Sequence, residues 1–261
     1  MKTALVTGAG GALGNGITKC LVADGWRVVA ADFRPHMAEG TAKEVGPDKV
    51  EAIGLDVRDY AAVTEAVAAI VDKYGAIDGL VNCAGGTGGV GVKNMPFMET
   101  TPAIRDTIMG ANLYGVLTCC HVALPHMMKA GKGAIVNISS GAGIPGGPHI
   151  WARRRNAVVY SSVKHGVIVF TQSLAQEVGP YGIRVNSIAP GRAVSTHQSP
   201  ETIAKLQALE EARQPGSSRQ SPLGRMLQAE DIGDTATFLL SERASHVTGC
   251  LYDLTGGLRL Y

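Results

Sequence analysis

A tyrosine and a lysine stand one helical turn apart in the segment Tyr160-Ser161-Ser162-Val163-Lys164. Side chains at this spacing share a helix face, so the phenol and the amino group can act together on one proton. A free phenol with a pKa of about 10 is a poor base at neutral pH and needs nearby positive charge, which Lys164 can supply. Ser140 can donate a hydrogen bond to a substrate oxygen on which charge develops. These residue types predict general acid–base chemistry, although a helix-face pair and a capping serine would show the same pattern.

A glycine-rich turn, Thr7-Gly8-Ala9-Gly10-Gly11-Ala12-Leu13-Gly14, follows the first apolar run and precedes a helical pattern. Glycines let the backbone turn tightly and approach a pyrophosphate, whose charge is met by amides at the helix N-terminus. Asp32 stands just past the second apolar run, where a carboxylate can bind both ribose hydroxyls of an adenosine. A ligand-free strand-to-helix turn would need the same glycines, but the position of Asp32 favours a dinucleotide. Asp32 also favours NAD over NADP because it would repel a 2′-phosphate. The positively charged Arg34, two residues on, argues against this preference.

Short apolar runs alternate with longer amphipathic stretches along the whole chain. This alternation predicts a single Rossmann-type domain, residues 1–261, with a doubly wound parallel sheet and helices on both faces. A less regular segment, about residues 190–225, is interpreted as a cover over the site. The expected strands are Ala4 to Val6, Arg27 to Ala31, Val50 to Leu55, Gly79 to Asn82, Gly133 to Ile138, Arg184 to Ile188 and Leu251 to Leu254.

Composition narrows the function classes. The 24 basic and 22 acidic residues give a formal charge of +2, which offers no electrostatic footprint for nucleic acid or an anionic membrane surface. Five cysteines without metal-ligand spacing favour buried free thiols in a reducing compartment, so we expect a cytoplasmic protein without a metal. The N-terminal apolar run is too short for a signal segment, and we expect no run long enough to span a bilayer.

Over nearly its whole length the chain resembles the classical short-chain dehydrogenase/reductase family. Thr7, Gly8 and Gly14 match the family's T-G-x-x-x-G-x-G motif, and Ala12 replaces its middle glycine. Further resemblances, in family order, are Asp56-Val57, Asn82-Cys83-Ala84-Gly85 with Cys83 departing from N-N-A-G, Asn112, Val136-Asn137-Ile138-Ser139-Ser140, the Y-x-x-x-K signature at Tyr160 and Lys164, and Pro190-Gly191.

The resemblance implies an NAD-dependent oxidoreductase that acts on a secondary alcohol or ketone and assembles as a homotetramer. It implies Asn112, Ser140, Tyr160 and Lys164 as the catalytic residues, with Asn112 fixing a water that links Lys164 to solvent. The expected cofactor-binding residues are Gly8, Gly10, Ala12, Leu13, Gly14, Asp32, Asp56, Val57, Asn82, Ala84, Gly85, Tyr160, Lys164, Pro190, Gly191, Ser195 and Thr196. A helical stretch with Val163, Val167, Phe170 and Leu174 could pack against a partner helix or inside the subunit.

The substrate is less defined. Ser140 and Tyr160 are farther apart than is usual in the family, and the extra residues include Arg153, Arg154 and Arg155. Guanidinium groups grip carboxylate, phosphate or sulfonate oxygens, so an anionic or sugar-like substrate is one interpretation; a solvated loop or a subunit contact is the other. Arg192 and His197 could join an anion site. The alternatives for the whole chain are an NADP-dependent 3-oxoacyl-type ketoreductase, an epimerase or dehydratase with retained NAD, and a non-catalytic NAD-binding regulatory protein.

Overall fold

The computed structural model describes residues 1–86, 95–144, 157–191, 193–194, 201, 204, 208 and 222–257. Parallel strands form a seven-stranded sheet in the order β3-β2-β1-β4-β5-β6-β9. The strands are β1 (Thr3–Thr7), β2 (Arg27–Asp32), β3 (Val50–Gly54), β4 (Gly79–Asn82), β5 (Gly133–Ile138), β6 (Ile183–Pro190) and β9 (Leu251–Leu254). The predicted doubly wound parallel sheet is confirmed, and every expected strand is present to within two residues.

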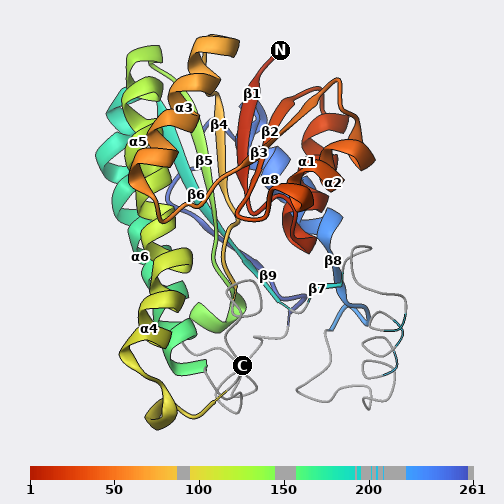
Figure 1. The fold of residues 1–261 in the computed structure, drawn as a ribbon, viewed down its shortest axis with the longest axis vertical. Coiled ribbons are helices and arrows are strands. Elements are labelled where there is room, and N and C mark those ends of the chain that lie inside the picture. The colour runs from red at the N-terminus through yellow and green to blue at the C-terminus, as the bar shows by residue number, and fades with distance from the viewer. Residues whose placement is uncertain are drawn as a thin grey trace.

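Helices cover both faces of this sheet (Figure 1). One face carries α1 (Ala12–Ala23), α2 (Pro35–Val45) and α8 (Ala229–Leu240), and the other carries α3 (Tyr60–Tyr74), α5 (Gly115–Ala130) and α6 (Ala157–Val178), with α4 (Pro102–Met109) leading into α5. Leu5, Leu80 and Ile135 pack toward α3, α5 and α6, whereas their neighbours Val6 and Val81 pack toward α1 and α8. Successive side chains alternate between the faces, so strands buried on both sides become continuous apolar runs.

Local signals start and stop these helices. The Asp59 carboxylate accepts a hydrogen bond from Ala62 N at the start of α3, and Thr101 does the same for Ile104 N at the start of α4. A capping box between Gln228 and Asp231 opens α8. Short 3₁₀ turns occupy Phe97–Glu99, Gly141–Gly143, Gly179–Tyr181 and Glu242–Ala244, and a π-helical turn spans Gly110–Tyr114.

The strand register aligns polar residues across the middle of the sheet. Thr7 pairs with Asn82, and Asn82 pairs with Asn137. Because the strands are parallel, these residues all lie near the carboxyl edge, where the chain leaves β1 and β4 for helices on opposite faces of the sheet. Such a switch point is where open α/β sheets bind ligands.

The apolar stretch on α6 packs inside the subunit. Val163, Val167 and Leu174 are buried against their own chain, and Phe170 packs on the same core. Val163, Val167 and Leu174 are therefore used in the core of their own subunit, and the homotetramer stays a prediction.

One helical stretch in the described part of the chain, Pro102–Ala130, is long and apolar enough by length and composition to cross a membrane. On these two criteria the expectation that no segment would qualify is wrong. The criteria are weak evidence for a span because core helices meet them too, and Val116, Cys119, Ala123 and Met127 of this stretch are core residues.

A short parallel pair joins the two ends of the expected cover segment. The chain leaves at β7 (Ala193–Val194) and returns at β8 (Leu227–Gln228), which pairs with it. Both ends thus lie together near the carboxyl edge of the sheet (Figure 1). What the segment between them covers stays a prediction.

Candidate active site

A cleft of about 870 Å³ opens at the carboxyl edge of the sheet. It brings together residues that lie far apart in the sequence: the turn after β1, the end of β2, the end of β4 and the first turns of α6. The sequence-predicted residues that line it are Gly8, Ala12, Leu13, Gly14, Asp32, Asp56, Val57, Ala84, Gly85, Ser140, Tyr160, Lys164 and Gly191.

The glycine turn forms one wall of the cleft. Gly8 adopts φ +66°, and a Cβ atom there would lie 2.7 Å from the Ala84 backbone. A Cβ atom at Gly14 would lie 2.2 Å from Gly8 O, so a larger residue would push the turn apart. The α1 N-terminus has no side-chain cap at Gly11, which leaves its first amides available to an anion. Ala12 is accommodated as the first residue of α1.

Asp32 is buried at the end of β2 and braces this turn. Its Oδ2 accepts a hydrogen bond from Gly10 N at 3.1 Å, and its Oδ1 accepts one from Arg34 N at 2.9 Å. The Arg34 guanidinium Nε lies 3.7 Å from Oδ1. Gly10 itself supports the carboxylate rather than lining the cleft. Each carboxylate oxygen keeps acceptor capacity for a ribose hydroxyl.

Asn82 anchors the end of β4 beneath the cleft. Its Nδ2 donates to Asn137 Oδ1 at 2.8 Å, and Asn137 Nδ2 donates to Thr171 Oγ1 at 2.9 Å, which ties β4 through β5 to α6. Thr7 Oγ1 accepts hydrogen bonds from the amides of Cys83 and Ala84, both at 3.2 Å. Sequence reasoning missed the contributions of Asn137 and Thr171, because their partners come from strand register and helix packing.

Asn112 is fully buried within the π-helical turn. Its Oδ1 accepts a hydrogen bond from Gly86 N at 2.7 Å, and its Nδ2 donates to Ile108 O at 3.0 Å. The side chain thereby fastens the loop after β4 to the helix that leads into α5. A π turn is frequent at functional sites, and nothing in the residue pattern predicts it. The water-holding role that the resemblance implies stays a prediction.

Ser140, Tyr160 and Lys164 meet at the deep end of the cleft. Lys164 is buried, and its Nζ donates to Ile138 O at 2.9 Å and lies 5.9 Å from the centre of the Tyr160 ring. Ser139 Oγ donates to Lys164 O at 2.7 Å, so this hydroxyl holds α6 against β5. Ser140 Oγ accepts a hydrogen bond from Ala142 N at 3.2 Å, and its own hydrogen can still act as a donor. Of the two serines, the geometry favours Ser140 as the donor.

Burial shapes the acid–base properties of this group. It lowers the pKa of Lys164 to about 8 by penalising the ammonium form, and it raises the pKa of Tyr160 above that of a free phenol. A hydrogen bond from Ser140 opposes the rise at Tyr160. In the protein by itself, the Ser140 hydroxyl is thus a group that favours the phenolate. The pKa of the Cys83 thiol, raised to about 12 by burial, keeps that cleft residue neutral.

The last predicted positions lie near the end of β6. Pro190 is buried in the strand, and Gly191 N donates to Leu254 O at 3.1 Å. Arg153, Arg154, Arg155, Arg192, Ser195, Thr196 and His197 lie outside the described residues.

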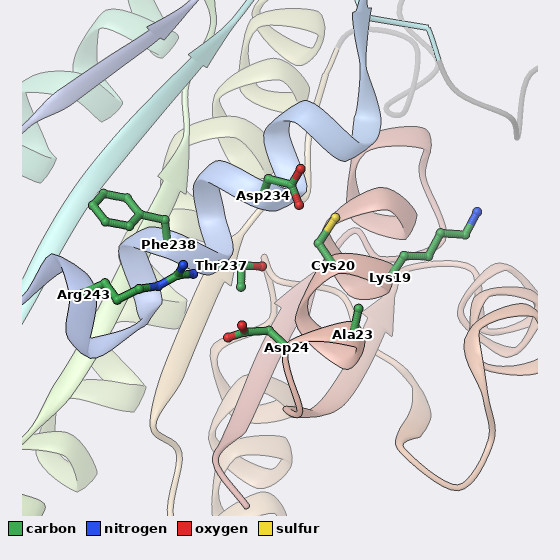
Figure 2. Close-up of a pocket in the computed structure, with 8 residues that line it drawn as sticks. All are labelled: Lys19, Cys20, Ala23, Asp24, Asp234, Thr237, Phe238 and Arg243. Atoms are coloured by element: carbon green, nitrogen blue, oxygen red, sulfur yellow. The ribbon is translucent and has the colours of Figure 1, made fainter.

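A second, more open hollow of about 590 Å³ lies between α1 and α8 (Figure 2). Burial and the neighbouring Asp234 raise the pKa of Cys20 to about 12, so its thiol is a poor nucleophile at neutral pH. Asp24, Asp234 and Arg243 on its rim are ordinary exposed side chains. The larger cleft with the Tyr/Lys pair is the candidate active site.

Comparisons with known proteins agree with this geometry. Residues 8–259 match the family described as enoyl-(acyl carrier protein) reductase. The 3-oxoacyl-(acyl-carrier-protein) reductase FabG of Thermotoga maritima is 34% identical over 98% of this chain and 97% of its own length. The sorbitol dehydrogenase of Cereibacter sphaeroides is 34% identical over 98% and 96%. The crystal structure of gox2181 superposes with a TM-score of 0.83 at 26% identity, covering 100% of this chain and 96% of that one. This chain belongs to the short-chain dehydrogenase/reductase family, whose oxidoreductases bind a nicotinamide cofactor.

Proposed function

We propose that this protein is an NAD-dependent alcohol dehydrogenase or ketoreductase, which transfers a hydride between nicotinamide and a secondary alcohol or ketone. The observation that carries the proposal is the convergence of two sets of residues on one cleft. The glycine turn and Asp32 line one end, and Ser140, Tyr160 and Lys164 line the other.

The residues of the cleft fit a dinucleotide. A side chain at Gly8 or Gly14 would clash with the surrounding backbone, so the turn stays bare, and the uncapped first amides of α1 can bind the charge of a pyrophosphate. Asp32 would hold the adenosine ribose, with Val57 beside the base. Lys164 Nζ donates one hydrogen bond to Ile138 O and keeps further N–H groups with which to hold the nicotinamide ribose.

The chemistry of the chain's own residues follows from their positions. When bound, nicotinamide supplies the carbon that accepts or gives the hydride, and in its oxidised form it adds positive charge. Tyr160 Oη takes the hydroxyl proton of the alcohol during oxidation and returns it to the carbonyl oxygen during reduction. Ser140 Oγ donates a hydrogen bond to that oxygen, on which negative charge develops. Removal of water from the cleft strengthens both interactions.

The preference for NAD rests on charge. A 2′-phosphate would meet the Asp32 carboxylate, which is buried and fixed by two backbone amides. Arg34 could favour the phosphate, but its guanidinium already lies beside Asp32. NAD, whose ribose offers hydroxyls as donors, is the better match.

An NADP-dependent 3-oxoacyl-type ketoreductase is the second candidate. It is favoured by one observation, the name of the Thermotoga maritima relative, a 3-oxoacyl-(acyl-carrier-protein) reductase. Its cofactor and its acyl substrate distinguish it from the first candidate, so a panel of secondary alcohols and 3-oxoacyl thioesters with both cofactors separates the two.

The first prediction concerns the base. Tyr160→Phe keeps the ring but removes the proton carrier, so turnover falls by at least ~100-fold while NAD binding, measured by calorimetry, is retained. Tyr181→Phe, at an exposed tyrosine, serves as the matched control and keeps normal turnover. Near-normal turnover in Tyr160→Phe would contradict the mechanism.

The second prediction concerns the cofactor. The wild type has a much higher kcat/KM with NAD than with NADP, and Asp32→Ala narrows this ratio because it removes the repelling charge. Asp32→Asn, which keeps an acceptor for Gly10 N, narrows it too. A wild-type preference for NADP would show that the role given to Asp32 is wrong.

The third prediction concerns the buried amine. The pKa of Lys164 is about 8 in the folded chain, against an ordinary value of 10.5. The cost of burying the ammonium is therefore fully present below pH 8, on the order of 3 kcal/mol, and declines as the pH rises toward 10.5. Without added cofactor, Lys164→Met raises the free energy of unfolding at about pH 7, and the gain falls by about half at pH 9.5. The control Lys129→Met, at an exposed lysine, changes the free energy of unfolding little. Equal effects of the two substitutions in urea unfolding would contradict the lowered pKa of Lys164.

The fourth prediction concerns the substrate, which we propose carries a negative charge recognised by Arg153, Arg154 or Arg155. Three adjacent guanidinium groups repel one another and suit an anion better than a neutral alcohol. Substituting the one that contacts the substrate by Ala raises KM about ten- to a hundredfold, with a smaller change in kcat. Each single variant is assayed with a hydroxy acid and with its neutral analogue. If all three treat both compounds as the wild type does, the arginines have another role.

A further inference from the structure

An ion pair stands at the adenosine end of the cleft. Asp56 Oδ1 and Oδ2 accept hydrogen bonds from Arg58 Nε at 2.9 and 3.1 Å, and Arg58 Nη2 donates to Oδ2 at 2.6 Å. Arg58 N also donates to Oδ1 at 3.0 Å. Both residues line the cleft beside Asp32 and Arg34. The Asp56 carboxylate thus accepts hydrogen bonds from both the side chain and the backbone N–H of Arg58.

An exposed phenylalanine completes this arrangement. Phe33 follows Asp32 directly, lines the cleft and is 64% exposed. The Arg58 guanidinium lies over its ring, 5.5 Å from the centre. A guanidinium that contacts a carboxylate and an aromatic face at once is held in one place rather than sweeping through solvent.

We propose that Asp56 is a specificity-determining residue that acts through Arg58: by holding the guanidinium it withholds that positive charge from the ribose 2′ position and so disfavours a 2′-phosphorylated cofactor. This inference rests on the proposed function and adds a second element to the repulsion by Asp32. The ligand class that the pair excludes is an adenosine with a phosphate on its 2′ oxygen.

Charge and geometry support this role. A freed arginine is a strong bidentate ligand for phosphate, and Arg58 reaches as far as Phe33, the neighbour of Asp32. Hydrogen bonds from Arg58 hold the pKa of Asp56 below its usual range, so the pair stays ionised at neutral pH. The other guanidinium at this end, on Arg34, lies beside the Asp32 carboxylate. Both arginines that line this end within the described part of the chain therefore lie beside a carboxylate.

The test is a double-mutant cycle read by binding. Dissociation constants of NAD and NADP are measured by calorimetry for the wild type, Asp56→Asn, Arg58→Met and the double variant. Asp56→Asn lowers the ratio of the NADP constant to the NAD constant by about tenfold, because the released Arg58 meets the 2′-phosphate. In the Arg58→Met background the same substitution changes the ratio by much less. Any loss of an Asp56 contact to the base affects both cofactors alike and cancels in the ratio.

A comparison of two variants at Arg58 keeps the test valid even if the Asp56→Asn variant does not fold. Arg58→Lys keeps a positive charge but loses the forked pair with Asp56, so that charge can move to the 2′-phosphate. The ratio of the NADP to the NAD dissociation constant is therefore lower in Arg58→Lys than in Arg58→Met. If the ratio in Asp56→Asn stays at its wild-type value, or falls equally with and without Arg58, the inference is overturned while the proposed function stands. A wild type that binds NADP more tightly than NAD overturns the proposed function itself, and the inference with it.

Discussion

The burial of the Lys164 amino group at the end of β5 is the constraint on which the rest of the site depends. Its Nζ donates to Ile138 O, while the Lys164 carbonyl accepts from Ser139 Oγ. The next residue, His165, donates from Nδ1 to Gly143 O at 2.9 Å. The first turns of α6 are thereby fixed to the end of β5 and to the segment after it, which carries Ser140. This attachment brings Tyr160, one turn earlier, into the same cleft.

A buried polar network joins the end of the cleft that holds Tyr160 and Lys164 to the end formed by the glycine turn. Thr7, Asn82 and Asn137 are neighbours across β1, β4 and β5, and Asn137 reaches Thr171 on α6. Inside an apolar core each unpaired polar group is unfavourable, so such a network favours one register over its alternatives. Sliding one strand would leave amides unpaired and would move the glycine turn away from the Tyr/Lys pair. The two halves of the site are therefore positioned by the same strand pairing.

Much of this arrangement could be predicted from the sequence, since it depends on local signals. Continuous apolar runs predicted the strands, and the glycines after β1 predicted the turn. The i, i+4 spacing predicted that Tyr160 and Lys164 share a helix face. The remaining features depend on contacts between distant segments. The π turn around Asn112 is stabilised by a hydrogen bond from Gly86 N, which lies 26 residues earlier in the sequence. The apolar spacing on α6 fits a partner helix and a core equally well, and only packing decided for the core.

The acid–base balance also required the structure. From residue types alone, Lys164 is the natural source of the charge that stabilises a phenolate, but its Nζ is directed to a backbone carbonyl and its own ammonium form is disfavoured by burial. Tyr160 consequently has a raised pKa in the protein alone. We therefore expect the positive charge of a bound oxidised cofactor to lower that pKa, so that the tyrosine acts as a base only when a hydride acceptor is present.

An ultraviolet difference titration of Tyr160 tests this claim most directly. The phenolate absorbance of the wild type is followed against pH with Tyr160→Phe subtracted, first without ligand and then with saturating NAD. We expect a midpoint above that of a free tyrosine in the protein alone and a clearly lower midpoint in the complex. A midpoint that NAD leaves unchanged, with NAD shown to be bound, would contradict this effect of the cofactor's charge on Tyr160.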